Sequence, residues 1–159
     1  MSSASLFKNN SLLIGISTML ILINSFRSGL ANADESVAND VVVVVNKANR
    51  LASLNKKQVI DIYMGRYLSF PDGKPAEPID FPSNTAEKAS FYLKLVNKEE
   101  RKIKSYWSRL LFSGRARPPL EAESMQDVVA LVEQKQDAIA YLPRNGVTSE
   151  MKIVYEFNQ

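Results

Sequence analysis

The sequence predicts a single α/β domain in which a mostly parallel sheet is flanked by helices. Two observations lead to this fold class. Residues 41–45 are five consecutive valines between Asp40 and Asn46, and a short β-branched run of this kind is typical of a strand buried on both faces. Segments with strand character and segments with helical spacing also follow each other in the order β-α-β-α-α-α-β-β, which favours helices that connect the strands of one sheet.

The first helix is expected directly after the valine strand and a polar loop. Asn55 is its predicted N-cap, and Gly65 is a natural terminator because glycine readily adopts the left-handed conformation that ends helices. The next segment contains Pro71-Asp72-Gly73, which indicates a surface turn. The apolar stripe of the helix is formed by Val59, Ile60, Ile62, Tyr63 and Met64.

A short extended segment and a second helix meet in residues 77–95. Ser83 or Asn84 is expected to cap this helix, with Glu87 placed to complete a capping box with Asn84. Its apolar positions follow helical spacing, and they are Ala89, Phe91, Tyr92 and Leu95.

The last part of the chain adds two helices and two strands. Residues 99–112 form an amphipathic helix that ends at Ser113-Gly114. A stiff basic loop follows, since Pro118 and Pro119 cannot continue a helix. Ser124 is the expected cap of a helix over residues 125–135. Strands are predicted at residues 138–142 and 152–157.

The helix start at residues 83–85 is the best candidate for a binding site. The hydroxyl and amide side chains of Ser83, Asn84 and Thr85 lie beside free backbone N–H groups, which suits an anion. The simpler interpretation is that these side chains only cap the helix. Arg115 and Arg117 lie on a loop and have two interpretations as well. They supply positive charge to a bound anion or to an acidic partner, or they are solvated cations near a helix C-terminus.

Composition excludes several classes of function. The chain of 159 residues has no cysteine and no histidine, so disulfides and thiolate chemistry are excluded, and the commonest metal ligand and neutral-pH base are missing. No recognisable catalytic motif is present, so an enzyme is not expected, and neither is a metal or a cofactor. No nucleic-acid partner is expected either. Without Lys8 and Arg27 of the leader described below, 20 − 2 = 18 basic residues face 17 acidic residues, which leaves no strongly basic surface to argue from.

The N-terminal residues resemble a signal peptide. An apolar run over residues 12–23 is short for a membrane span and is followed by Ala31-Asn32-Ala33, a small-x-small pattern. Cleavage after Ala33 would leave a mature domain of residues 34–159, and the protein is expected in the periplasm. A retained N-terminal anchor is the alternative.

Two segments resemble one lobe of the periplasmic phosphate-binding proteins of ABC importers. One is the strand Val41-Val-Val-Val-Val-Asn with the helix Leu54-Asn-Lys-Lys-Gln-Val-Ile-Asp-Ile-Tyr-Met-Gly-Arg. The other is Ala138-Ile-Ala-Tyr-Leu, which is similar to a glycine-containing strand of that family, with Asp137 and Ala140 in place of two glycines. The likeness extends from about residue 41 to residue 142 and is closest to short, single-lobe relatives.

The resemblance implies non-covalent binding of phosphate or another small oxyanion, linked to a membrane transporter. The family's Ser-Gly-Thr motif at a helix start corresponds to Ser83, Asn84 and Thr85. The family's arginine falls near Ile79 or Asp80, and neither can supply its charge. One lobe alone also lacks the wall that closes over a ligand. The alternative is therefore a module that has lost its ligand and docks on a membrane or sensor protein.

Overall fold

The valine run is the innermost part of the structure. The computed structural model describes residues 40–157, and in it the run forms strand β1 (Val41–Asn46), whose six residues are all buried. All six side chains are covered because β1 lies between two other strands and has helices packed over the sheet. The described residues belong to one compact unit, Val37–Gln159. The predicted signal peptide lies outside the described residues.

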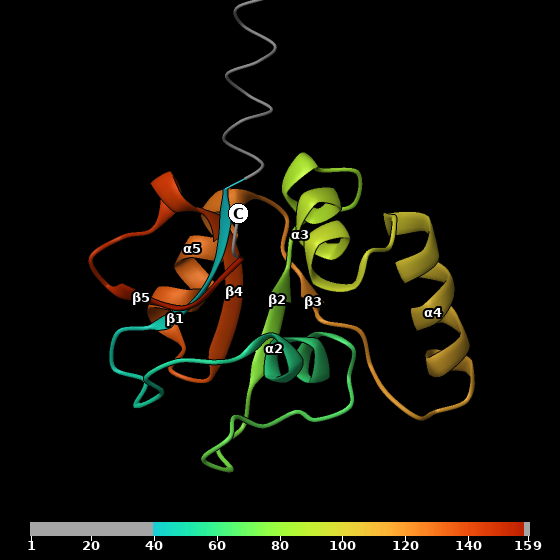
Figure 1. The fold of residues 1–159 in the computed structure, drawn as a ribbon, viewed down its shortest axis with the longest axis horizontal. Coiled ribbons are helices and arrows are strands. Elements are labelled where there is room, and N and C mark those ends of the chain that lie inside the picture. The colour runs from blue at the N-terminus through green and yellow to red at the C-terminus, as the bar shows by residue number, and fades with distance from the viewer. Residues whose placement is uncertain (1–39, 158–159) are drawn as a thin grey trace, which may run out of the picture. The chain divides into compact units, whose positions relative to one another are not determined.

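The sheet has five strands in the order β3-β2-β4-β1-β5 (Figure 1). β2 (Glu77–Asp80) pairs in parallel with β3 (Leu120–Glu121) and with β4 (Ala138–Pro143). β1 pairs antiparallel with β4 and with β5 (Met151–Glu156). The α/β class with flanking helices is confirmed, but the expectation of a mostly parallel sheet is wrong, because two of the four pairings are antiparallel. A strand buried on both faces has the same apolar pattern in either direction, so the sequence did not reveal the direction of β1.

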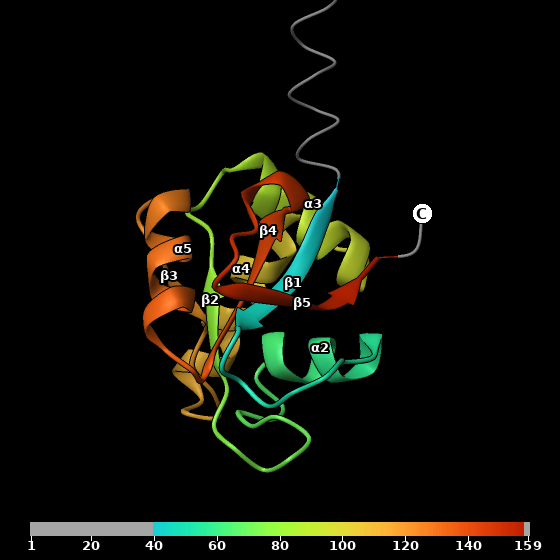
Figure 2. The ribbon, with the colours of Figure 1, turned by 90° about the vertical axis from the view of Figure 1, so that its left-hand side faces the viewer.

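Helices cover both faces of this sheet (Figure 2). α5 (Met125–Gln134) packs on one side, and α2 (Lys56–Tyr63) and α3 (Ala86–Val96) pack on the other. α4 (Glu100–Phe112) packs against α3 at the edge of the domain. A short 3₁₀ turn, Arg144–Gly146, follows β4. No helix among residues 40–157 is long and apolar enough to cross a membrane.

Most predicted helix boundaries are confirmed. Asn55 and Gln58 form a reciprocal capping box at the start of α2, and Gly65 follows its end with φ +67°. Ser124 caps α5 through its contact with the backbone of Asp127. The two-residue strand β3 was not predicted, because a strand this short has no alternation to detect.

The predicted start of α3 is wrong. Thr85 is the N-cap, with an extended backbone (φ −91°, ψ 151°) and a side chain that accepts from Lys88 N. Asn84 has φ 66°, in the left-handed region, and so turns the chain before the helix instead of capping it. The capping box between Asn84 and Glu87 therefore does not form, since the third helical position after Thr85 is Lys88.

Candidate functional site

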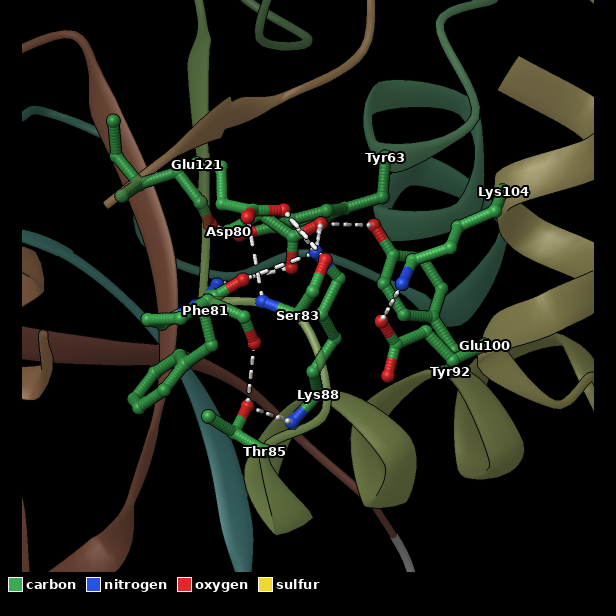
Figure 3. Close-up of polar contacts among 12 residues, drawn as sticks. Tyr63, Asp80, Phe81, Ser83, Thr85, Lys88, Tyr92, Glu100, Lys104 and Glu121 are labelled. Atoms are coloured by element: carbon green, nitrogen blue, oxygen red, sulfur yellow. Dashed lines mark hydrogen bonds and ion pairs between the residues drawn. The ribbon is translucent and has the colours of Figure 1, made fainter. Parts of the chain in front are cut away.

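The candidate site is the turn of residues 81–85, which joins the carboxyl end of β2 to α3 (Figure 3). Two buried charges lie beneath it. Asp80 is the last residue of β2 and is 5% exposed, and Lys88 on the first turn of α3 is 4% exposed. The Lys88 ammonium lies 3.2 Å from Asp80 Oδ2. Burial of two charges is costly unless each is paired and hydrogen-bonded, so the surrounding contacts decide whether this arrangement holds.

Asp80 accepts hydrogen bonds from several directions. The hydroxyl of Tyr92 donates to Oδ2 at 3.0 Å, and the hydroxyl of Tyr141 donates to Oδ1. The backbone N–H of Phe81 also donates to Oδ1, at 3.0 Å. The carboxylate thus has an ammonium, two phenols and an amide around it, which satisfies its oxygen lone pairs inside the protein.

Protonation follows from this environment. Burial raises the pKa values of Tyr92 and Tyr141 well above their usual range, and Asp80 adds to the effect, so both hydroxyls remain donors. Burial also raises the pKa of Asp80, while Lys88 and the hydrogen bonds act against it. For Lys88, burial alone would lower the pKa, but Asp80 and Glu121 outweigh it and raise the pKa. The raised pKa keeps Lys88 protonated at neutral pH, so a cation lies under the turn.

Glu121 of β3 connects Lys88 to the turn. Its Oε2 lies 2.7 Å from the Lys88 ammonium. The same carboxylate accepts from Ser83 N and from Ser83 Oγ, each at 3.3 Å. The hydrogen bond from Lys88 is the main cause that lowers the pKa of Glu121 below its usual value. An ionised carboxylate of this chain thus already occupies the donors of Ser83.

Glu100 occupies the next donor in the same manner. The backbone N–H of Asn84 donates to both carboxylate oxygens of Glu100, at 3.0 and 3.2 Å. Lys104, one turn further along α4, pairs with this carboxylate at 3.1 Å. Partial burial would raise the pKa of Glu100, but the hydrogen bonds from Lys104 and Asn84 N prevail and lower it. The turn therefore holds two carboxylates, one from β3 and one from α4.

The residues predicted from the sequence have different roles in the structure. Ser83 and Asn84 present N–H groups to carboxylates, whereas the Thr85 hydroxyl donates to Pro82 O at 2.9 Å and caps α3. Arg115 and Arg117 are exposed on the loop after α4, and within residues 40–157 no hydrogen bond or ion pair joins either of them to Ser83, Asn84 or Thr85.

Sequence reasoning missed the residues that complete the site. Asp80 was considered only as a position that cannot supply the arginine charge of the resembled family, although its carboxylate pairs with Lys88. Lys88 lies three residues after the true N-cap, and the spacing gave no sign that a lysine would be buried there. Glu121 was missed with β3, and Glu100 was assigned only to a helix start. These residues contact one another although they are far apart in sequence, and a local sequence pattern cannot predict such contacts.

A cavity of about 390 Å³ borders the candidate site, because Glu121 lines it together with residues of β3, the following loop and α5. Further surface cavities lie elsewhere on the domain. One of about 390 Å³ is lined by the loops at the carboxyl end of β1 and before β2 and β4, and its residues are Ala48, Asn49, Arg50, Phe70, Lys74, Pro75, Gln136 and Asp137. Within the described part of the chain, no group of acidic side chains has the arrangement of a metal site. Residues 81–85 of the turn line none of these cavities, and their N–H donors already face the carboxylates of Glu121 and Glu100.

Comparison with known proteins gives a likeness in structure only. No protein-family model and no curated protein sequence matches the chain. Among solved structures, an ABC-type phosphate transport receptor from Vibrio cholerae matches with a TM-score of 0.58 and 16% identity, over 72% of this chain and 45% of that one. A putative phosphate ABC transporter substrate-binding protein with bound phosphate from Clostridium perfringens matches with a TM-score of 0.58 and 15% identity, over 72% and 44%. A possible phosphate-binding protein from Planctomyces limnophilus matches with a TM-score of 0.51 and 15% identity, over 72% and 40%.

All three matches are to proteins named for phosphate transport or phosphate binding, and all cover the same share of this chain, 72%. The chain spans less than half the length of each of these three proteins, which agrees with the expected likeness to a single lobe. At this identity the likeness shows the fold and not the ligand. The chain therefore has the fold of one part of the phosphate substrate-binding proteins of ABC transporters.

Proposed function

We propose that this chain is an exported, periplasmic domain of the substrate-binding-protein type that binds phosphate or a similar small oxyanion without covalent chemistry. The binding position is the turn of residues 81–85, and the proposed partner is a membrane transporter. The fold it shares with phosphate-transport proteins supports this proposal. It is not proposed to be an enzyme, because the site offers donors and a fixed cation but no nucleophile activated by a base.

One observation carries the proposal: the turn already binds two oxyanionic groups. Ser83 N and Asn84 N each donate to a carboxylate, and the Lys88 ammonium lies against one of them. Backbone N–H groups at a helix start, with a cation behind them, are the arrangement that phosphate binding uses. A bound oxyanion would take the place of the Glu121 carboxylate and share its donors.

This arrangement makes the predicted affinity low. A dianion must displace Glu121 from Lys88 and approach Glu100 and Asp80, which repel it. The turn is also open to water, which screens each contact. We therefore expect that Glu121→Gln, which removes the competing charge, raises the association constant for phosphate roughly tenfold.

The test is isothermal titration of residues 34–159 with phosphate, sulfate and simple carboxylates. This segment contains the whole described core, which lies within residues 40–157. Saturable heat that increases in Glu121→Gln and decreases in Ser83→Ala supports the proposal. Ser108→Ala is the matched control, because that hydroxyl is exposed on α4 and donates only within its own helix. If a folded protein and its Glu121→Gln variant both give no heat with any anion, the oxyanion proposal is rejected.

The second candidate is a ligand-free module that docks on a membrane or sensor protein. The observation that favours it is the same pair of contacts, because two carboxylates of the chain itself, Glu121 and Glu100, satisfy the donors of the turn. In that case Glu121 links β3 to α3 through Lys88, and no anion competes with its carboxylate for the donors of the turn. The two candidates differ in the Glu121→Gln variant: the first predicts stronger anion binding, and the second predicts only a less stable fold.

A further inference from the structure

The outward face of α4 differs from the rest of the surface in charge and in apolar exposure. Ile103 and Trp107 point into the domain and are buried. The opposite face, at positions one helical turn apart, carries Arg101, Ser105, Ser108, Arg109 and Phe112, all of which are exposed. Among residues 40–157, the inner side of the helix packs on the domain and the outward side does not.

The cations of this region are not neutralised by the protein. In the described part of the chain, six exposed lysines and arginines in and beside α4 make no ion pair: Lys98, Arg101, Lys102, Arg109, Arg115 and Arg117. The acids nearest in sequence lie at the start of the helix. Glu99 is its exposed N-cap, and Glu100 is held by Asn84 N and Lys104. The rest of the helix and the following loop to Pro119 contain no acid. We call the α4 face the outward cations Arg101 and Arg109, the loop cations Arg115 and Arg117, and the exposed side chains Leu111 and Phe112 at the end of the helix.

The end of the α4 face is apolar and unusually exposed. Phe112 is 94% exposed and Leu111 is 56% exposed. Both lie in the last turn of α4, just before Gly114, at the outer edge of the domain (Figure 1). A phenyl ring in water has no stabilising role in the fold, since it buries almost no area there. Its position among unpaired cations indicates a surface that becomes covered.

We propose that the α4 face docks on an anionic lipid surface, with the cations at the headgroups and Leu111 and Phe112 inserted between them. Unpaired lysines and arginines beside one or two large apolar side chains are the composition of interfacial membrane-binding segments. The N-terminal sequence favours a lipid over an acidic protein. A retained anchor over residues 12–23, the alternative to cleavage after Ala33, would hold the domain at a membrane, because only 40 − 23 − 1 = 16 residues lie between its end and Asp40 at the start of the described domain. This proposal does not depend on oxyanion binding at the turn.

Vesicle flotation tests the proposal directly. Residues 34–159 are mixed with vesicles that contain phosphatidylglycerol, or with vesicles of phosphatidylcholine alone, over a series of salt concentrations. We expect binding to the anionic vesicles only, with an affinity that falls as salt rises. Arg101→Gln with Arg109→Gln should reduce the affinity at least about tenfold, because each cation near an anionic surface contributes substantially.

Two matched controls separate the α4 face from general charge. Lys47→Gln with Arg50→Gln removes the same charge from exposed positions outside α4 that form no ion pair within residues 40–157, and it should leave most of the binding intact. Phe112→Ser should weaken binding several-fold more than Tyr67→Ser, an exposed aromatic (62%) outside α4.

Three results would overturn the proposal. The first is absence of binding to anionic vesicles by a protein with native circular dichroism. The second is an equal loss in the two double variants, which would mean that only net charge matters. The third is Phe112-dependent self-association, or Arg101-dependent binding to polyglutamate without lipid binding, either of which would show that the α4 face takes a protein.

Discussion

Lys88 is the residue on which the polar site depends. It is buried, lies between Asp80 and Glu121, and also donates to Phe81 O at 3.0 Å. Through these contacts one ammonium joins β2, the turn, α3 and β3. A buried cation with three acceptors is stable only as long as each acceptor remains in place.

Lys88→Met should destabilise the domain by about 3 kcal/mol. The apolar side chain fits the volume but leaves Asp80 as a buried charge without its cation. Urea unfolding followed by circular dichroism measures the loss. A second variant, Lys88→Met with Asp80→Asn, should recover part of it, because the uncompensated charge is gone. If the double variant is less stable than the single one, the pairing assigned to Asp80 is wrong.

Gly65→Ala should cost about 2 kcal/mol. Gly65 has φ +67°, and an added Cβ would lie 2.7 Å from the Trp107 ring and 3.2 Å from Ala116 Cβ. Gly73→Ala is the control, because Gly73 has φ +83° but no atom within 4 Å of the added Cβ. It should lose only the backbone component, about 1 kcal/mol. Equal losses in urea unfolding would mean that the contact between the end of α2 and α4 is loose.

At the scale of elements, the start of α3 separates what the sequence can predict from what it cannot. Three features were predicted from the sequence: β1 from its valine run, the two ends of α2 from Asn55 and Gly65, and the start of α5 from Ser124. Each of these signals acts through residues that are neighbours in sequence. The start of α3 was misplaced because Ser83, Asn84 and Thr85 are all acceptable caps. Which of the three caps the helix depends on Asn84, whose backbone adopts the left-handed conformation. The N–H group of Asn84 donates a hydrogen bond to Glu100, which belongs to another helix.

Thr85→Val should destabilise α3 and the domain by about 1 kcal/mol, because the hydroxyl that accepts from Lys88 N is lost. Thr85→Ser keeps an acceptor and should cost much less. The measurement is urea unfolding together with amide exchange at Lys88, which should be faster in the valine variant. The same result limits the use of Thr85 in binding assays, since its substitution disturbs the helix as well as the turn.

The directions of the pairings also lay beyond the sequence. β1 was assigned to a mostly parallel sheet, but it runs antiparallel to β4 and β5. The site on the turn of residues 81–85 stays a prediction, and the side chains that surround the turn lay beyond the sequence. Asp80, Lys88, Glu100 and Glu121 come from β2, α3, α4 and β3, so only the folded chain brings them together.

At the scale of the whole molecule, acid should destabilise the domain. Glu121, Glu100 and Glu156 all have lowered pKa values, chiefly through Lys88, Lys104 and Arg144. A carboxylate whose folded pKa is depressed contributes stability above its unfolded pKa, here 4.5, and loses it as pH falls through the folded pKa. The contribution of Asp80 to the pH dependence of stability has the opposite sign, because burial raises its pKa in the folded state.

Thermal melts from pH 7 downwards measure this effect. We expect the melting temperature to decrease below the ordinary glutamate pKa of 4.5. Glu121→Gln should show a smaller decrease than the original chain, because it has no ion pair with Lys88 to lose. A steeper decrease in the variant would contradict the assignment of Glu121 as the ionised partner of Lys88.

The position of β1 in the sheet also determines when the domain can fold. Val41 pairs with Pro143, at a separation of 143 − 41 = 102 residues, and Val42 pairs with Glu156. The first strand of the domain therefore cannot pair until the last two strands are available. When the N-terminus emerges first, the five valines of β1 stay unpaired until nearly the whole chain has emerged. Such long-range pairing slows folding, and an exposed valine strand is prone to aggregate. Late closure of the sheet also means that a chain truncated before β5 leaves one edge of β1 without its partner strand, so such truncations should be insoluble.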